Sequence, residues 1–160
     1  MIILSAVMFL SSAAAEPSVT KDQATPPRRH LVYAEALGKA GPYGVGWELA
    51  ITPRLSLGVA GSFAMLGGQQ LYTIAPYLHA AALRGGRHTL FGELGLVVIH
   101  SHLPSPVAEW DGMSDTGAGG QATLGWQWQP GRWVVRTSGG IAAGQHGIAP
   151  IVGLALGITL

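Results

Sequence analysis

The chain has 160 residues, of which 24 are Gly, 48% are hydrophobic and only 11% are charged, with a net charge of +1 and no Cys. Charge is thus far below the ~25% of ordinary proteins and Gly about twice the usual ~7%, so disorder is excluded. The absence of Cys excludes disulfide frameworks and Cys-ligated metal sites, and the scattered Lys and Arg residues form no basic patch for nucleic acid.

The N-terminal segment is typical of an export signal. An apolar run over residues 2–10 leads into small residues ending at Ala15, which match the A-x-A pattern of signal-peptidase sites. The run is too short to span a membrane as a helix, although no Lys or Arg precedes it. We expect residues 1–15 to be a signal peptide and the polar, Pro-containing residues 16–29 to be a flexible periplasmic leader.

From residue 30 onward, bulky and small residues alternate. In residues 43–52 the odd positions are all bulky, whereas the even positions hold Gly, Glu, Ala or Thr. A period of two indicates strands, because successive side chains of a strand point to opposite faces. Eight segments show this pattern, some with less contrast: 30–39, 43–52, 54–65, 71–83, 89–102, 118–129, 133–144 and 148–160.

These segments have the length and surface of membrane strands. They exceed the ~5–6 residues usual in soluble strands and match the ~9–11 residues of a tilted membrane strand. One parity is bulky and apolar, and the other is mostly Gly, Ala, Ser and Thr, which suits lipid outside and a narrow lumen inside. A soluble sandwich or lipocalin-like barrel would need a more polar outer face, and strict alternation in membrane helices would put bulk on every side. The sequence therefore predicts an all-β fold, an eight-stranded antiparallel up-and-down transmembrane β-barrel over residues 30–160.

The connections between the segments alternate in kind. Short turns are expected at 52–54, 84–87 and 129–132. The other connections, of which only the first is tight, are 39–42, 66–70, 103–117 and 145–147. Because outer-membrane barrels have short periplasmic turns and longer outer loops, we expect both termini on the periplasmic side.

The first predicted hairpin carries a resemblance to a known group. Residues 32–38 (VYAEALG) followed by 43–48 (YGVGWE) resemble the opening of small eight-stranded outer-membrane barrels, the group of OmpX-like, OmpW-like and OmpA-type transmembrane domains. The resemblance covers nearly all of residues 30–160 and implies a monomer in the Gram-negative outer membrane. It implies outer-membrane lipids, lipopolysaccharide and the barrel-assembly machinery as partners, with no cofactor and no nucleic acid. One departure is Leu160 at the end of the chain, where these barrels commonly have an aromatic residue.

Polar residues of the inward parity fall at similar heights above the short turns. Ionised groups inside a narrow barrel must pair, because an isolated buried charge is costly. Three Glu residues face one Arg and one His, so we expect one Glu to be protonated or the His to be charged. We expect this layer to plug the lumen; a gated or proton-linked pore constriction is the alternative. Its members are Glu35, Glu48, Tyr77, His79, Glu93, Gln127 and Arg136.

Beyond this layer, towards the longer loops, the inward positions are nearly all small. They predict a cup that is open or covered by the 103–117 loop and could hold a small ligand, although small residues also serve close packing. They are Gly44, Gly46, Ala60, Ser62, Ala64, Thr73, Ala75, Gly95, Gly119, Gly140, Ala142 and Gly144.

The His100-Ser101-His102 run raises two hypotheses. The two His could ligate a metal together with His146, but their parity places them on the lipid face near the outer rim, where we expect histidines without a metal. A lipid-A-deacylase-like enzyme would need a His and a Ser two residues apart on one face, whereas Ser101 faces the opposite way. We therefore expect no catalytic residues and no enzyme activity.

Acidic and aromatic residues mark the two ends of the predicted barrel. Glu109, Asp111 and Asp115 lack the spacing of a calcium loop, so we expect solvated charges in the long loop rather than a site for divalent cations between lipopolysaccharide phosphates. Arg54, Arg84, Arg87 and Arg132 lie beside the short turns, where we expect lipid headgroups. The aromatic girdle expected at the same end comprises Trp47, Trp126, Trp128 and Trp133.

These patterns predict a structural or surface-interaction role in the outer membrane. The alternatives are a narrow pore for small solutes or protons and a lipid-A-modifying barrel enzyme. The enzyme is the least favoured of these three roles, because no nucleophile accompanies the predicted inner carboxylates.

Overall fold

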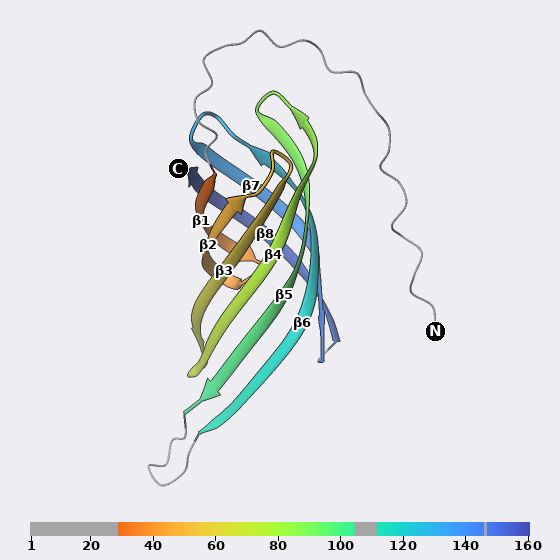
Figure 1. Ribbon diagram of the computed structural model, residues 1–160. Coiled ribbons are helices and arrows are strands. Elements are labelled where there is room, and N and C mark those ends of the chain that lie inside the picture. Colours follow the sequence, from red (N-terminus) through yellow and green to blue (C-terminus); the bar gives the residue numbers. More distant parts are fainter. Residues whose placement is uncertain (1–28, 105–111, 146) are drawn as a thin grey trace, which may run out of the picture.

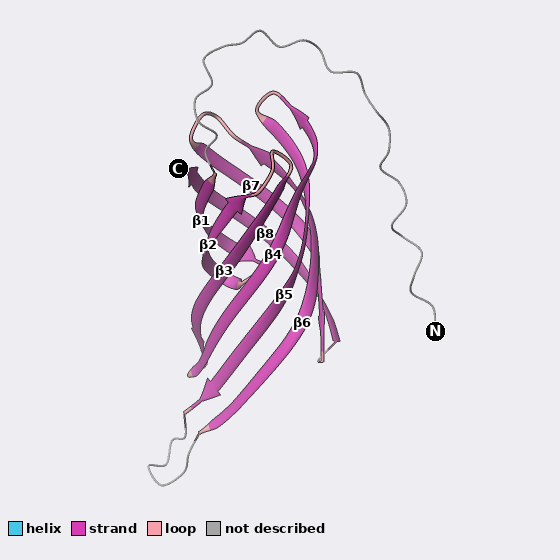
Figure 2. Ribbon diagram, in the orientation of Figure 1, coloured by secondary structure: helices cyan, strands magenta, loops and turns pink. Residues whose placement is uncertain are grey.

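The computed structural model describes residues 29–104, 112–145 and 147–160, and within them eight antiparallel strands close into a barrel (Figure 1, Figure 2). Each strand pairs with the next along the chain, and the first pairs with the last. The predicted up-and-down barrel is thereby confirmed. No helix long and apolar enough to cross a membrane is found among the described residues. The strands are β1 His30–Gly38, β2 Gly41–Ala50, β3 Leu55–Leu66, β4 Gln69–Gly85, β5 His88–Leu103, β6 Met113–Trp128, β7 Trp133–Gly144 and β8 Gly147–Thr159.

The alternation of the sequence separates the two faces of the barrel wall. Leu94 and Leu124 are 65% and 75% exposed on the outside, whereas the preceding residues, Glu93 and Thr123, are buried in the lumen. A similar alternation runs along most of each strand, so the outside is largely apolar and much of the buried interior is polar. Such an inverted distribution suits a barrel surrounded by lipid.

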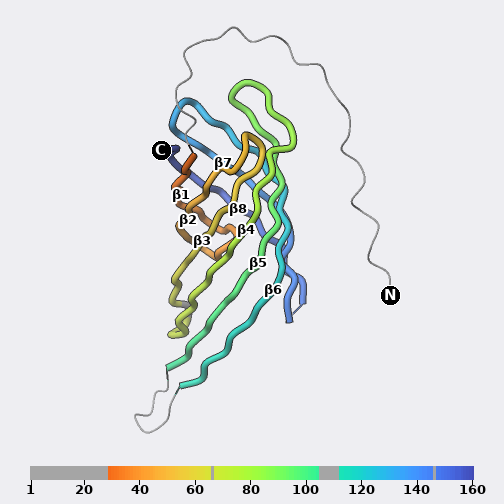
Figure 3. The backbone as a smooth tube through the Cα atoms, in the orientation of Figure 1, coloured from red at the N-terminus to blue at the C-terminus, as the bar shows by residue number. Residues whose placement is uncertain are grey.

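The two ends of the barrel differ. The β2–β3, β4–β5 and β6–β7 turns lie at the same end as His30 and Leu160, and we call this the terminal end (Figure 3). The other four connections form the loop end. The expectation of longer connections at 66–70 and 145–147 is wrong, because the strands continue further than the alternation indicates and leave only two residues between β3 and β4 and two between β7 and β8. Strands β4 to β6 have 16 or 17 residues, against 9 and 10 in β1 and β2, so the wall extends much further on one side at the loop end (Figure 1).

The predicted loop over residues 103–117 is too long. Strand β6 begins at Met113, not at residue 118, and pairs with β5 as far as Leu103. Residues 113–117 show no contrast between bulky and small side chains, so their strand character becomes visible only through this pairing. Asp115 consequently lies on a strand opposite Ser101. Glu109 and Asp111 are outside the described residues, as are His146, the predicted signal peptide and residues 16–28 of the predicted leader.

The β1–β2 connection also differs from a simple tight turn at 39–42. Leu37 has a left-handed backbone with φ 57° and a 67% exposed side chain, although its parity would point it inward. After this kink Lys39 and Ala40 turn into the barrel and are 6% and 1% exposed. The Ser62 hydroxyl donates a hydrogen bond to the Ala40 carbonyl and holds the tip there. A left-handed Leu costs about 1–2 kcal/mol, which the contacts of the inserted tip must offset.

Candidate functional site

The centre of the lumen is crossed by connected polar side chains, which we call the lumen network. They come from six of the eight strands and from the inserted β1–β2 tip. All are nine-tenths or more buried and are joined by hydrogen bonds or ion pairs. The members are Tyr33, Glu35, Lys39, Glu48, Tyr77, His79, Glu93, Thr123, Gln127 and Arg136.

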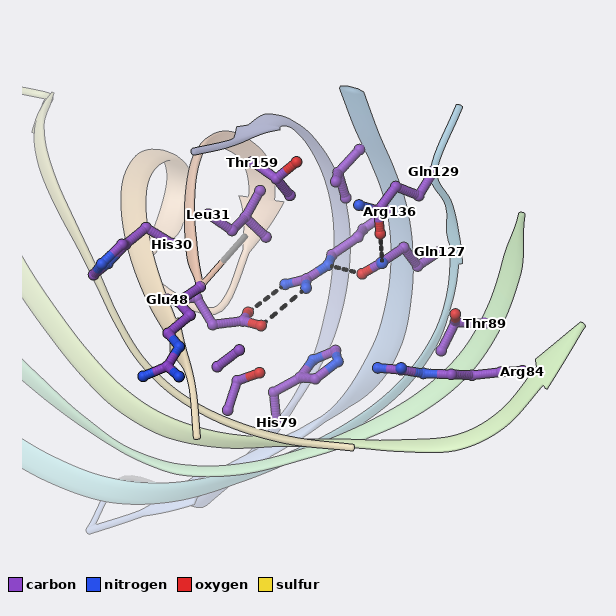
Figure 4. A pocket seen from close by; sticks show the side chains of 14 residues that line it. His30, Leu31, Glu48, His79, Arg84, Thr89, Gln127, Gln129, Arg136 and Thr159 are labelled. Carbon is purple, nitrogen blue, oxygen red and sulfur yellow. Dashed lines mark hydrogen bonds and ion pairs between the residues drawn. The ribbon is translucent and has the colours of Figure 1, made fainter. Parts of the chain in front are cut away.

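One half of the lumen network is a bidentate ion pair between Arg136 and Glu48. Arg136 donates to both carboxylate oxygens of Glu48, from Nη1 at 2.7 Å and from Nη2 at 3.2 Å (Figure 4). Its Nε donates to Gln127 Oε1 at 2.6 Å, and its guanidinium lies 5.4 Å from the centre of the Phe91 ring. The planar guanidinium is thus held by partners along its edge and over its face, the geometry for which Arg is suited.

The other half is centred on Lys39. Its ammonium lies 3.2 Å from Glu35 Oε1 and 3.1 Å from Glu93 Oε2, and 4.6 Å from the centre of the Tyr77 ring. Glu93 also contacts His79 Nδ1 at 3.2 Å and accepts a hydrogen bond from the Thr123 hydroxyl at 3.2 Å. Glu93 therefore has partners on both carboxylate oxygens.

Two tyrosines connect these halves. The Tyr33 and Tyr77 hydroxyls are 2.8 Å apart, and Tyr77 donates to Glu48 at 3.2 Å. The rings lie against the backbone of Gly46 and Gly58, where a Cβ atom would overlap Tyr33 and Tyr77 respectively. Glycine at these inward positions therefore makes room for aromatic rings, and part of the predicted cup is filled.

The charge count of the predicted layer needs a correction. The structure adds Lys39 to the predicted set of one Arg, one His and three Glu. With two permanent cations against three carboxylates, a single proton on His79 or on a carboxyl group neutralises the network. Sequence reasoning placed Lys39 in a turn because parity cannot describe a hairpin tip that bends inward. One feature of the sequence could have indicated that Lys39 enters the lumen. It is the only Lys beyond residue 30, and it follows the inward Glu35 by four residues.

The lumen network separates two cavities. A cavity of about 120 Å³ opens at the terminal end and reaches Glu48, His79 and Arg136, with Arg84 and Gln129 at its side (Figure 4). A larger cavity of about 370 Å³ lies at the loop end, lined by strands β4 to β8. Of the small residues predicted to form the cup, Gly119, Ala142 and Gly144 line this loop-end cavity.

Glu48, His79 and Glu93 offer ligand atoms within 4.8 Å of one another, a spacing that would suit a metal ion. The cations already present speak against that role. Arg136 pairs with Glu48 and lies 3.8 Å from Glu93, and Lys39 contacts Glu93. Because these carboxylates are compensated by protein cations, the arrangement is better described as an ion-pair network.

The two rim histidines lie on the outer face at the loop end, and each contacts a hydroxyl on β6. His100 Nδ1 is 2.8 Å from Thr116 Oγ1, and His102 Nδ1 is 2.8 Å from Ser114 Oγ. Ser101 instead lines the loop-end cavity on the opposite face. His146, the third predicted ligand candidate, lies outside the described residues.

The four predicted interfacial tryptophans are exposed on the outer face towards the terminal end. Trp47 stacks on His30 with ring centres 5.7 Å apart, and Trp126 stacks on His88 at 5.5 Å. Trp128 and Trp133 flank the β6–β7 turn. The aromatic side chains are thus grouped with Arg54, Arg84, Arg87 and Arg132 at one end of the barrel.

A closed eight-stranded barrel with an apolar outside and a charged lumen is the fold of small bacterial outer-membrane barrels, and solved structures bear out this class. Ail, the attachment invasion locus protein of Yersinia pestis, matches with a TM-score of 0.53 at 9% identity, over 82% of this chain and 92% of that chain. The N-terminal β-barrel domain of Pseudomonas aeruginosa OprF matches with a TM-score of 0.57 at 12% identity, over 82% and 96%.

Ail in complex with the heparin analogue sucrose octasulfate matches with a TM-score of 0.54 at 11% identity, over 81% of this chain and 94% of that chain. At these identities the likeness is one of fold. No protein-family model and no curated protein matches the sequence.

Proposed function

We propose that this chain is a monomeric bacterial outer-membrane barrel with a structural or surface-interaction role, its lumen plugged by the lumen network. The supporting observation is the paired, buried set of charges between the two cavities, with Arg136–Glu48 on one side and Lys39–Glu93 on the other. A solute would have to break these ion pairs to pass. Such a barrel acts through its outer surface and its exposed loops.

The proposed orientation puts the terminal end in the periplasm. Tryptophans and arginines gather at that end, where an aromatic girdle and cations would meet lipid headgroups, and the longest connection, between β5 and β6, belongs to the opposite end. The partners proposed with this orientation are outer-membrane lipids, lipopolysaccharide and the barrel-assembly machinery. The proposed role is non-enzymatic, since the hydroxyls beside His100 and His102 come from the opposite strand and not from the pattern of a lipid-A deacylase.

The surface interaction we propose is not recognition of a sulfated polysaccharide. Ail binds a heparin analogue in one of its solved structures. In this chain, Lys39 is the only Lys or Arg in the loop-end connections, and its side chain is buried in ion pairs. A polyanion approaching the loop end would meet no exposed Lys or Arg in these connections, so neutral or cationic partners suit this end better.

A narrow pore for small solutes or protons is the second candidate. It is favoured by the presence of a cavity towards each end of the barrel, of which the terminal-end cavity reaches Glu48, His79 and Arg136 of the network. His79 contacts Glu93 and also lines the terminal-end cavity, so it could pass a proton into the network.

Planar-bilayer recording separates the two candidates. The chain from residue 16 is refolded into vesicles, its folding is checked by heat-modifiable gel migration, and conductance is recorded. A plugged barrel gives no single-channel steps, whereas discrete steps from folded wild-type protein would favour the pore. Location is tested separately: in cells, protein that stayed in the soluble periplasm and ran identically boiled and unboiled would refute the outer-membrane role.

A further inference from the structure

We propose that the terminal-end cavity binds a small oxyanion, of the size of phosphate or sulfate, from the aqueous phase. Such a site requires neither conduction through the barrel nor the surface role proposed above. Three features of the structure support it: the charges that line the cavity, a β-bulge that turns Arg84 into it, and two available hydroxyl groups on its wall.

The lining of the cavity carries an excess of positive charge. Among the described residues it includes Arg29, Arg84 and Arg136, but only one carboxylate, that of Glu48. Arg136 donates to both oxygens of Glu48, so these two charges compensate each other. Arg29 and Arg84 form no ion pair within the part of the chain that the structure describes. Two cations therefore remain in a concave site, and a cleft lined by one sign of charge concentrates ions of the opposite sign.

A β-bulge aims Arg84 into the cavity. His79 and Ala81 of β4 are buried in the lumen, so regular alternation would put residue 83 inside and Arg84 outside. The register with β5 shifts between Ala81 and Leu83, and Leu83 is 66% exposed on the outer face. Arg84 is consequently paired with Thr89, which also lines the cavity, and points into the lumen (Figure 4). Bulges commonly re-aim a side chain beside a functional site, which is the role we assign to this one.

Arg29 and two hydroxyl groups complete the proposed site. The Arg29 carbonyl accepts a hydrogen bond from the Ala50 N–H at 2.7 Å, which fixes the backbone of Arg29 beside the end of β2. Ser56 and Thr89 also line the cavity, and their hydroxyl groups form no hydrogen bond with any residue that the structure describes. A hydroxyl group can donate to an anion, so the cavity offers neutral donors in addition to its two cations.

The size and enclosure of the cavity indicate a free ion. A cavity of about 150 Å³ holds benzene, so the volume of about 120 Å³ found here has room for an ion as small as phosphate. Side chains from all eight strands line the cavity, so the barrel wall lies between it and the headgroups of the surrounding lipid. An oxyanion from solution therefore suits the site better than the phosphate group of a membrane lipid.

An NMR titration with an internal control tests this proposal. The chain from residue 16 is isotope-labelled, folded in octyl glucoside micelles, which contain no phosphate, and titrated with sodium phosphate, sulfate or chloride at equal ionic strength. We expect the amide signals of Ser56 and Thr89 to shift saturably with both oxyanions, and those of Ser101 and Ala142 in the loop-end cavity to stay unchanged. Equal shifts of Ser56 and Thr89 with chloride would indicate general screening and overturn the proposal.

Matched variants separate the cavity from the general charge of the terminal end. Arg84→Gln should weaken sulfate binding by about fivefold to tenfold, because a charged donor is lost. Arg87→Gln lies three residues further along the chain and outside the cavity lining, so it should leave the affinity unchanged. Heat-modifiable migration verifies that both variants fold. Binding of sulfate to Arg84→Gln as tightly as to wild type, or equal losses in the two variants, would refute the role of the bulge and of Arg84.

A repeat of the titration in phosphatidylcholine nanodiscs identifies the source of the anion. Equal affinity for sulfate in micelles and nanodiscs is the result expected for a free ion, because the barrel wall keeps lipid headgroups out of the cavity. Loss of saturation in nanodiscs would show that the headgroup phosphate competes for the cavity, and would overturn the assignment to a free oxyanion. Neither result depends on conductance through the barrel, so failure of this proposal and failure of the plugged-barrel proposal are distinguishable.

Discussion

Replacing Lys39 by Met tests whether the β1–β2 tip is held in the lumen by charge. Met has nearly the length and shape of the Lys stem, so the substitution keeps the packing and removes the ammonium. Lys39 and its two carboxylate partners have side chains no more than 4% exposed. Removing one partner of a buried ion pair typically costs about 3–5 kcal/mol, because the other charge stays buried. Glu93 keeps His79 and Thr123, so Glu35 bears most of this loss.

The assay is equilibrium unfolding in urea from lipid vesicles, followed by Trp fluorescence and gel migration. At a slope of about 2 kcal/mol per molar urea, a loss of about 4 kcal/mol lowers the midpoint by about 2 M. Arg87→Met is the matched control, since Arg87 is exposed in the β4–β5 turn and should change stability by less than about 0.5 kcal/mol. Combining Lys39→Met with Glu35→Gln should recover about 1–3 kcal/mol relative to the sum of the single variants. If Lys39→Met costs no more than Arg87→Met, the tip is not anchored by these ion pairs.

Two further predictions concern the two faces of the wall. Gly58→Ala should destabilise the barrel by about 1–3 kcal/mol, because the added Cβ would overlap the Tyr77 ring. Gly61→Ala is the control and should be nearly neutral, because its Cβ would make an ordinary 3.5 Å contact. Equal unfolding midpoints of the two variants would contradict the packing described for Tyr77. Leu124→Arg places a charge on the outer face and should cost about 2–4 kcal/mol in vesicles, against about 0–1 for Leu83→Arg on the same face beside the β4–β5 turn. An unchanged midpoint for Leu124→Arg would argue that this face does not meet lipid.

Residue alternation was enough to predict the barrel, because the strand period of two is a local property. The face of each residue follows from its neighbours in the sequence, without knowledge of any partner strand. The bulky Leu94 and Leu124 are assigned to the outside because they follow the polar Glu93 and Thr123. The same parity put Glu35, Glu48, His79, Glu93 and Arg136 inside. The extent of β6 was not predictable in this way, since residues 113–117 carry no alternation and become a strand only by pairing with β5.

The sequence by itself thus determined the number of strands, which way their residues face and which charged strand residues enter the lumen. Only the tertiary structure decided how those charges are compensated, because after the kink at Leu37 the β1–β2 tip bends into the barrel and brings Lys39 between Glu35 and Glu93. It also decided which small residues make room for Tyr33 and Tyr77 and which line a cavity. Both outcomes depend on distances across the lumen, between residues far apart in the chain, and a local pattern contains no information about such distances.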